Sequence, residues 1–156
     1  MNFHHKILDE IYKLDFDSAL ELGCDGKNLP VLELLRTHYP DVPITGCDNI
    51  LFANGVNKAK ALNIKLDAVD LNFGLNYPDK SFDLVFTSAV LMYVKNIEQI
   101  SEDILRVARK WVVLGEVMDR DYMALIKANW TWIDIDKNFW PGSTYKNNGK
   151  IMIGKI

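Results

Sequence analysis

Acidic side chains and glycines follow three predicted strands in chain order. Residues 21–28 read Glu-Leu-Gly-Cys-Asp-Gly-Lys-Asn, Asp48 ends the second strand, and Asp70 with Leu71 follows the third. Glycine lets a backbone approach a ligand closely, whereas carboxylates accept hydrogen bonds from ribose hydroxyls or an exocyclic amine. Leu71 would supply an apolar wall for a base. The three segments together predict a nucleoside-binding site.

Each of these acidic residues also has a purely structural interpretation. Asp25 or Asn28 could cap the helix that follows the glycine turn, and Asp48 or Asn49 could cap the next one, because Asp and Asn are preferred helix caps. Taken singly, each acid is more often a cap or a solvated turn residue. Their occurrence at one expected sheet edge favours the ligand site.

The elements that must position these residues alternate along the chain. Strands are predicted at 18–22, 42–47, 65–69, 82–87 and 111–117, with helical periodicity in residues 3–14, 31–38, 50–62, 97–107 and 122–128. Residues 131–135 and 150–156 are expected to close the fold as an antiparallel hairpin. This alternation predicts an α/β fold, and the length of 156 residues predicts one domain, 1–156.

Two details of the helices are expected from the same spacing. Phe3, Ile7 and Ile11 share one face of the first helix, which we expect to pack against the sheet edge. In the helix over residues 50–62, we expect Phe52, Val56 and Ala59 to face inward.

Composition excludes several kinds of partner. The net charge of −3 and the scattered Lys and Arg residues leave no basic face for a nucleic acid. No apolar run approaches the roughly 20 residues that a membrane helix requires. The polar opening residues do not form a secretory signal, so we expect a cytoplasmic protein. Cys24 and Cys47 form no CxxC pair, and we therefore expect buried, reduced thiols and no metal site.

The stretch Leu75–Phe86, reading LNYPDKSFDLVF, with Val90–Val94 shortly after it, is the most distinctive sequence feature. It resembles the class I S-adenosylmethionine-dependent methyltransferase family, specifically its small methyltransferase-type-11-like domains. The resemblance extends more loosely over residues 18–117. It implies a Rossmann-like three-layer sandwich with a mostly parallel seven-stranded sheet and an antiparallel C-terminal strand. It also implies S-adenosylmethionine as cofactor and a small-molecule acceptor.

Carried over position by position, the resemblance assigns a cofactor site. Residues 21–28 would surround the methionine part, Asp48 would hold the ribose, and Asp70 with Leu71 would contact adenine. Thr87 and Ser88 would line the floor near the sulfonium. The implied cofactor-binding residues are Glu21, Gly23, Cys24, Asp25, Gly26, Asp48, Asn49, Asp70, Leu71, Thr87 and Ser88.

The sequence departs from the family pattern at two places. Asp25 and Lys27 stand where relatives have glycines, and Asp25 is expected to tolerate a positive φ there. Tyr93 stands where many relatives have histidine, so that base is absent and the catalytic residues are unassigned. Tyr93 could orient a substrate, but the favoured interpretation is a half-buried aromatic residue.

These departures leave alternatives open. The chain is either an active small-molecule methyltransferase or a cofactor-binding, catalytically degenerate domain that acts as a partner subunit, and a homodimer could complete an open site. A dehydrogenase-like nucleotide-binding domain is the least favoured interpretation. An aromatic group near the C-terminus is expected to complete the core or, less often, to wall an acceptor pocket; it comprises Trp130, Trp132, Phe139 and Trp140.

Overall fold

A computed structural model of the chain describes residues 3–136 and 148–156. The described strands form one seven-stranded sheet in the order β3-β2-β1-β4-β5-β7-β6. Strands β1 to β5 are parallel, and β7 runs antiparallel to both β5 and β6. The strands are β1 (Ala19–Leu22), β2 (Ile44–Asp48), β3 (Lys65–Ala68), β4 (Phe82–Ser88), β5 (Ala108–Val117), β6 (Asn129–Ile135) and β7 (Gly149–Lys155).

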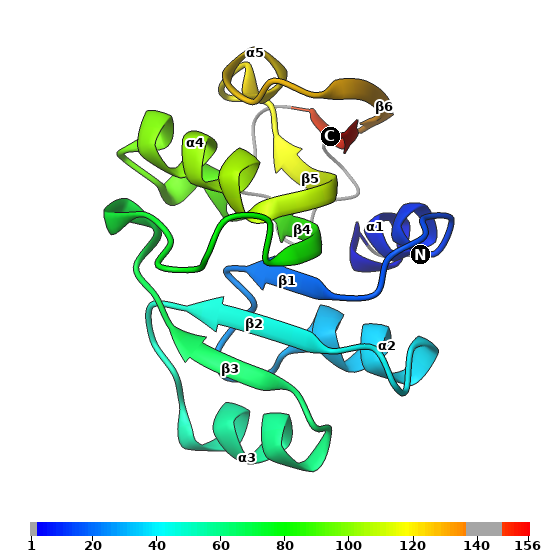
Figure 1. The fold of residues 1–156 in the computed structure, drawn as a ribbon, viewed down its shortest axis with the longest axis vertical. Coiled ribbons are helices and arrows are strands. Elements are labelled where there is room, and N and C mark those ends of the chain that lie inside the picture. Colours follow the sequence, from blue (N-terminus) through cyan, green and yellow to red (C-terminus); the bar gives the residue numbers. More distant parts are fainter. Residues whose placement is uncertain (1–2, 137–147) are drawn as a thin grey trace.

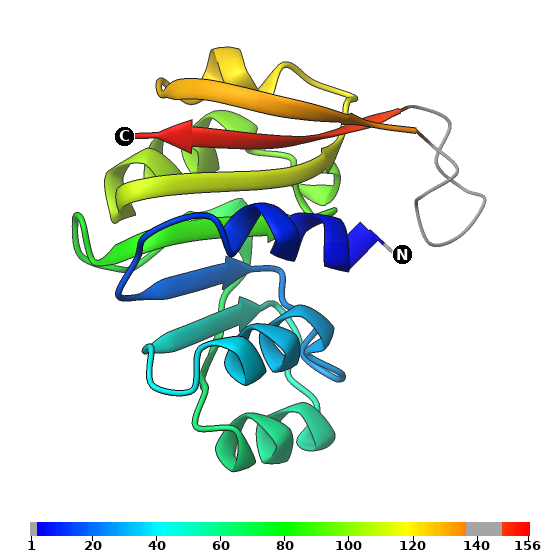
Figure 2. The ribbon, with the colours of Figure 1, turned by 90° about the vertical axis from the view of Figure 1, so that its right-hand side faces the viewer.

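Helices cover both faces of this sheet, which confirms the predicted three-layer α/β sandwich (Figures 1 and 2). One face carries α1 (Phe3–Ile11), α2 (Pro30–His38) and α3 (Ala53–Ala61), and the other carries α4 (Ile97–Val107) and α5 (Tyr122–Leu125). Two short 3₁₀ turns, η1 (Leu71–Phe73) and η2 (Leu91–Tyr93), follow β3 and β4.

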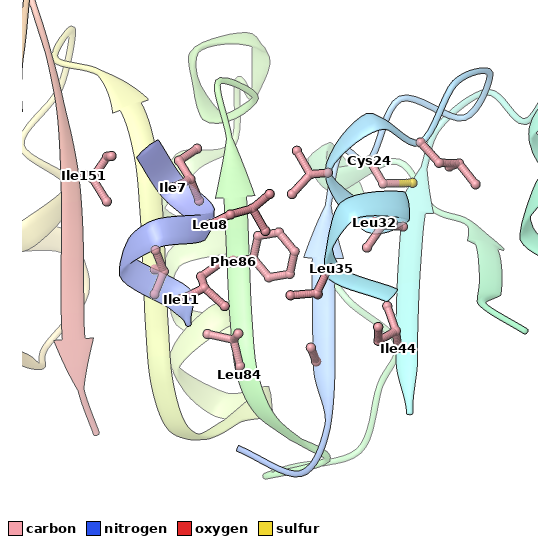
Figure 3. Close-up of a cluster of buried hydrophobic side chains, with 14 of the residues drawn as sticks. Ile7, Leu8, Ile11, Cys24, Leu32, Leu35, Ile44, Leu84, Phe86 and Ile151 are labelled. Atoms are coloured by element: carbon pink, nitrogen blue, oxygen red, sulfur yellow. The ribbon is translucent and has the colours of Figure 1, made fainter. Parts of the chain in front are cut away.

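The central strands are buried on both faces because their apolar side chains alternate between two cores. Leu84 and Phe86 of β4 face the α1–α2 side, while Val85 packs on the α4 side. Figure 3 shows Ile7, Leu8 and other side chains of the first core meeting over the sheet. Burial on both faces is typical of parallel strands, and β4 lies where a strand was predicted over residues 82–87.

Helix α1 lies on the face of the sheet, so the expected packing against the sheet edge is wrong. Ile7 is fully buried, and its Cδ1 would lie 2.4 Å from a Cβ added at Gly115 of β5. The absence of a side chain at Gly115 therefore lets α1 approach the middle of the sheet. Apolar periodicity identified the inward face of α1 but could not show which strands that face covers.

Two further expectations are corrected by the structure. Phe52 is 48% exposed and precedes α3, because that helix begins one residue later at Ala53, whereas Ala59 is buried as predicted. Trp132 in the edge strand β6 is 52% exposed, so it does not complete the core. Phe139 and Trp140 lie outside the described residues.

Cys24 and Cys47 are both buried and free, as expected. No helix in the described ranges is long and apolar enough to cross a bilayer. Within the same ranges, no cluster of His, Cys, Asp or Glu side chains could hold a metal ion.

Candidate functional site

A cavity opens at the edge of the sheet where β1, β2 and β4 end. Its volume is about 410 Å³, within the range of small-molecule sites. The strand order places the ends of β3, β2, β1 and β4 side by side along it. The cavity is lined by Gly23, Asp25, Asp48, Asn49, Val69, Asp70, Leu71, Asn72, Ser88, Ala89, Val90, Tyr93 and Val94.

The turn after β1 forms the cavity wall nearest the middle of the sheet. Gly23 has φ +69°, a conformation that favours glycine, and its amide donates to the Cys47 carbonyl oxygen over 2.9 Å. A Cβ at Gly23 would lie 2.3 Å from Cγ2 of Val90, so Val90 packs directly over this glycine. Gly23 therefore joins the turn after β1 to the segment after β4.

Asp25 adopts the expected positive φ, at +56°. Its carboxylate accepts from the backbone amides of Lys27 and Asn28 over 3.2 and 3.3 Å, and from the Asn28 amide side chain over 3.1 Å. Asp25 thus stabilises the turn before α2, while Leu29 occupies the cap position itself without a side-chain cap bond. Neither Asp25 nor Asn28 caps α2, so the capping interpretation of these two residues is wrong.

Asp48 and Asn49 line the cavity at the end of β2, and neither caps α3. That helix has Phe52 at its cap position and no side-chain cap bond. Asp70 differs, because its carboxylate accepts from the backbone amide of Asn72 over 2.9 Å and caps η1. Leu71 is 8% exposed and contributes an apolar surface next to it. Asp70 therefore caps η1, as its structural interpretation expected, and it also lines the cavity.

Four of the residues assigned from the resemblance do not line the cavity: Glu21, Cys24, Gly26 and Thr87. Glu21 is only 2% exposed, and its Oε2 has no hydrogen-bond partner among the described residues. Burial, together with nearby Asp48 and Asp25, raises the pKa of Glu21 well above its ordinary value. Period-two alternation points the side chain of Thr87 away from the cavity that Ser88, the next residue, lines.

Several residues near the cavity were not identified from the sequence. Val69, Asn72, Ala89, Val90 and Val94 also line it. Val69 and Asn72 flank the assigned pair Asp70 and Leu71, and Ala89 and Val90 follow Ser88, so the position near each strand end was the available signal. Val94 lies farther along, in the stretch Val90–Val94 that the family resemblance singled out. Tyr93 is 68% exposed on the cavity side of η2, so the expectation of a half-buried aromatic residue is wrong.

Beneath the segment after β4 lies Glu116 of β5, which is fully buried. Its carboxylate accepts from the backbone amides of Val90 and Leu91 over 3.2 Å each. Burial raises the pKa of Glu116 to about 7, against the opposing effect of its hydrogen bonds. Glu116 therefore holds in place the backbone that lines one side of the cavity.

On the outer side of the same segment lies His4 of α1. Its Nδ1 is 3.1 Å from the Oγ of Ser88, although the two residues are 84 positions apart. Burial, and secondarily the neighbouring His5, lowers the pKa of His4, while Asp25 acts in the opposite direction. No pattern in the sequence points to this pair, because nothing in the spacing relates α1 to the end of β4.

The arrangement of the sheet and cavity defines the fold of class I S-adenosylmethionine-dependent methyltransferases. The N-methyltransferase NodS from Bradyrhizobium japonicum WM9, solved with S-adenosyl-L-homocysteine, has a TM-score of 0.67 at 14% identity, covering 97% of this chain and 84% of NodS. YcgJ from Bacillus subtilis has a TM-score of 0.69 at 12% identity, covering 98% of both chains. The [4+2]-cyclase SpnF has a TM-score of 0.71 at 15% identity, covering 97% of this chain and 78% of its own.

A match of the sequence to a family model identifies the family of the chain, whereas the structural similarities show its fold. Residues 4–116 match the family described as methionine biosynthesis protein MetW. The match covers more than half of the chain, and the chain therefore belongs to the MetW family. No curated protein sequence matches the chain.

Proposed function

We propose that this chain binds S-adenosylmethionine in the cavity and transfers its methyl group to a small-molecule acceptor. The observation that carries the proposal is the order of polar groups along the cavity. Asp70 follows β3, Asp48 ends β2, Gly23 follows β1 and Ser88 ends β4. Since strands lie about 4.8 Å apart, these four positions span roughly 14 Å, which suits an elongated nucleoside joined to an amino acid.

The assignment of groups along this line follows from their chemistry. Asp70 and Leu71 would hold the adenine, with a carboxylate for its amine and an apolar side chain for its ring. Asp48, whose carboxylate accepts no hydrogen bond from the described residues, would accept from the ribose hydroxyls. The turn from Gly23 to Asp25 would then face the amino-acid part of the cofactor.

The charge of the site fits a cationic ligand. Asp25 and Asp48 line the cavity, and buried Glu21 lies close enough for both to raise its pKa. A ligand with a sulfonium and an ammonium group would relieve the repulsion among these three acids. When bound, S-adenosylmethionine supplies an activated methyl group, so the protein contributes mainly position and orientation.

The alternative function is a cofactor-binding partner subunit without turnover. It is favoured by Asp25 and Lys27, which stand where relatives have glycines. The Asp25 carboxylate already accepts hydrogen bonds from backbone amides of its own turn. The similarity to SpnF, described as a [4+2]-cyclase, also shows that this fold serves other reactions. In this case the site would bind the cofactor, but no acceptor would be methylated.

Isothermal titration with S-adenosylmethionine and S-adenosylhomocysteine tests the proposal. We expect micromolar binding by the wild-type protein and at least a tenfold loss for Asp48→Ala. Asp9→Ala, which removes an exposed carboxylate from α1, is the matched control and should bind as the wild type does. Absence of binding by the wild-type protein contradicts both functions, whereas binding with no turnover of any acceptor favours the partner subunit.

A further inference from the structure

The pair formed by His4 and Ser88 lies at one end of the proposed cofactor site. Ser88 lines the cavity at the end of β4, and the His4 ring contacts its hydroxyl from the outer side over 3.1 Å. Figure 2 shows that α1 begins on the side of the molecule where β1 and β2 end, which is the side of the cavity. The pair therefore links the cavity to a half-buried imidazole on another element.

The order of the site places the reactive end of the cofactor beside this pair. With adenine at β3 and ribose at β2, the group attached beyond the ribose extends toward β1 and β4, because those strands come next in the sheet. Ser88 ends β4, and Ala89 and Val90 continue the cavity wall. An acceptor that meets the methyl group at this end would contact the Ser88 hydroxyl.

We propose that Ser88 and His4 form a proton relay for an acceptor that carries a hydroxyl group. This inference rests on the proposed function and narrows the class of its acceptor. An acceptor that is already ionised, such as a carboxylate, needs no base, whereas a hydroxyl must lose its proton as it is methylated. A hydroxyl hydrogen-bonded to a neutral imidazole is suited to pass that proton on.

The acceptor oxygen bonds to the methyl carbon while the carbon–sulfur bond breaks and leaves its electron pair on sulfur. The acceptor proton moves to the Oγ of Ser88, whose own proton moves to Nδ1 of His4. His4 becomes an imidazolium and later releases the Nδ1 proton to water, which restores the neutral ring with its hydrogen on Nε2. Asp25, whose negative charge acts on His4, would stabilise the imidazolium in the interval.

The environment of His4 suits this role. Burial and the nearby His5 lower its pKa, so the ring is neutral and able to accept a proton at neutral pH. The charged groups that shift the pKa of His4 are the His5 ring and the Asp25 carboxylate. For the relay to work, neutral His4 must carry its hydrogen on Nε2, leaving Nδ1 to accept from Ser88.

Nuclear magnetic resonance of the histidine side chains tests the relay without a known acceptor. The chain has three histidines, and His4→Gln, His5→Gln and His38→Gln assign their signals. Each histidine is titrated with saturating S-adenosylhomocysteine and again with S-adenosylmethionine, which differ by the positive charge on sulfur. We expect the pKa of His4 to be lower by about one pH unit with S-adenosylmethionine, while that of His38 is unchanged.

Nitrogen correlation spectra of the same samples should show Nδ1 of neutral His4 without a hydrogen. Ser88→Ala should then raise the pKa of His4, because it removes a donor that favours the neutral ring. If both ligands bind but the pKa of His4 is the same with each, or if Nδ1 carries the hydrogen, the relay is wrong and the cofactor site stands. If neither ligand binds, the proposed function fails and the relay fails with it.

Discussion

The backbone of Gly26 lies so close to Gly55 and to Ile50 that neither glycine has room for a side chain. A Cβ at Gly55 would lie 2.0 Å from the carbonyl oxygen of Gly26, and a Cβ at Gly26 would lie 2.1 Å from that of Ile50. The amide of Phe52 also donates to the Gly26 carbonyl oxygen over 3.0 Å. The turn after β1 is thereby held against the start of α3.

We expect Gly55→Ala to destabilise the protein by about 2 kcal/mol, because the new methyl group overlaps a backbone atom that cannot move freely. In an exposed helix the same change would stabilise by about 1 kcal/mol, so the sign of the effect reports the close approach. Urea unfolding measures it. Asn54→Ala, at an exposed position in the same helix, is the control and should change stability by less than about 0.5 kcal/mol.

A second prediction concerns the left-handed residue of the glycine turn. Asp25→Ala and Asp25→Gly both lose the hydrogen bonds to residues 27 and 28, but only alanine retains the steric cost of φ +56°. We therefore expect the alanine variant to be less stable than the glycine variant by about 1 kcal/mol. The matched pair is Asp9→Ala and Asp9→Gly, at an exposed position inside α1. Here the alanine variant should be the more stable of the two by about 1 kcal/mol, because alanine has a higher helix propensity than glycine. Equal stability of the two Asp25 variants would contradict the strained turn.

A third prediction concerns the pH dependence that Glu116 introduces. The folded protein holds the pKa of this buried carboxyl at about 7, above its value in the unfolded chain. Between the two values the folded state retains a proton that the unfolded state has lost, so stability falls as pH rises from about 4.5 to 7. Over this range the free energy of unfolding falls by at most roughly 3 kcal/mol.

Glu116→Gln removes this titration and keeps an oxygen that can accept from Val90 and Leu91. We expect its free energy of unfolding, relative to that of the wild type, to increase from pH 5 to pH 8. The difference between the two proteins isolates Glu116 from Glu21, whose pKa is raised in the same direction. A difference that stays constant over this range would show that Glu116 does not titrate there.

A fourth prediction concerns Arg36, a 9%-exposed cation at the end of α2. Its guanidinium donates to five backbone carbonyl oxygens between 2.8 and 3.0 Å away, those of Tyr39, Pro40, Val42, Leu62 and Asn63. Lysine has three donors on one atom and cannot reproduce this fork. We expect Arg36→Lys to cost about 2–4 kcal/mol, because buried carbonyl groups lose their donors.

The matched control for this change is Arg109→Lys. Arg109 is half-exposed and pairs with Asp83, which Lys110 also approaches at 3.5 Å. Lysine at 109 can still make an ion pair there, so we expect a change below about 1 kcal/mol. Thermal or urea unfolding of both variants makes the comparison, and equal losses would show that the carbonyl network of Arg36 does not contribute specifically.

The sequence by itself determined the type and order of nearly all the elements and the sheet edge at which Asp48 and Asp70 line a cavity. Apolar periodicity is a local property, so it located α1, α4 and the alternating faces of β4. Asp48 and Asp70 could be assigned because parallel strands of an open sheet place their carboxyl ends at one edge. The distinctive stretch Leu75–Phe86 pointed to the family fold.

Only the tertiary structure decided which side chains from distant elements meet. His4 reaches Ser88 because α1 lies across the sheet face, and Val90 covers Gly23 because β4 lies next to β1. Glu116 lies beneath the segment after β4 for the same reason, since β5 pairs with that strand. Spacing along a chain fixes only neighbours a few residues apart, whereas these contacts depend on strand order and on the packing of helices against both faces.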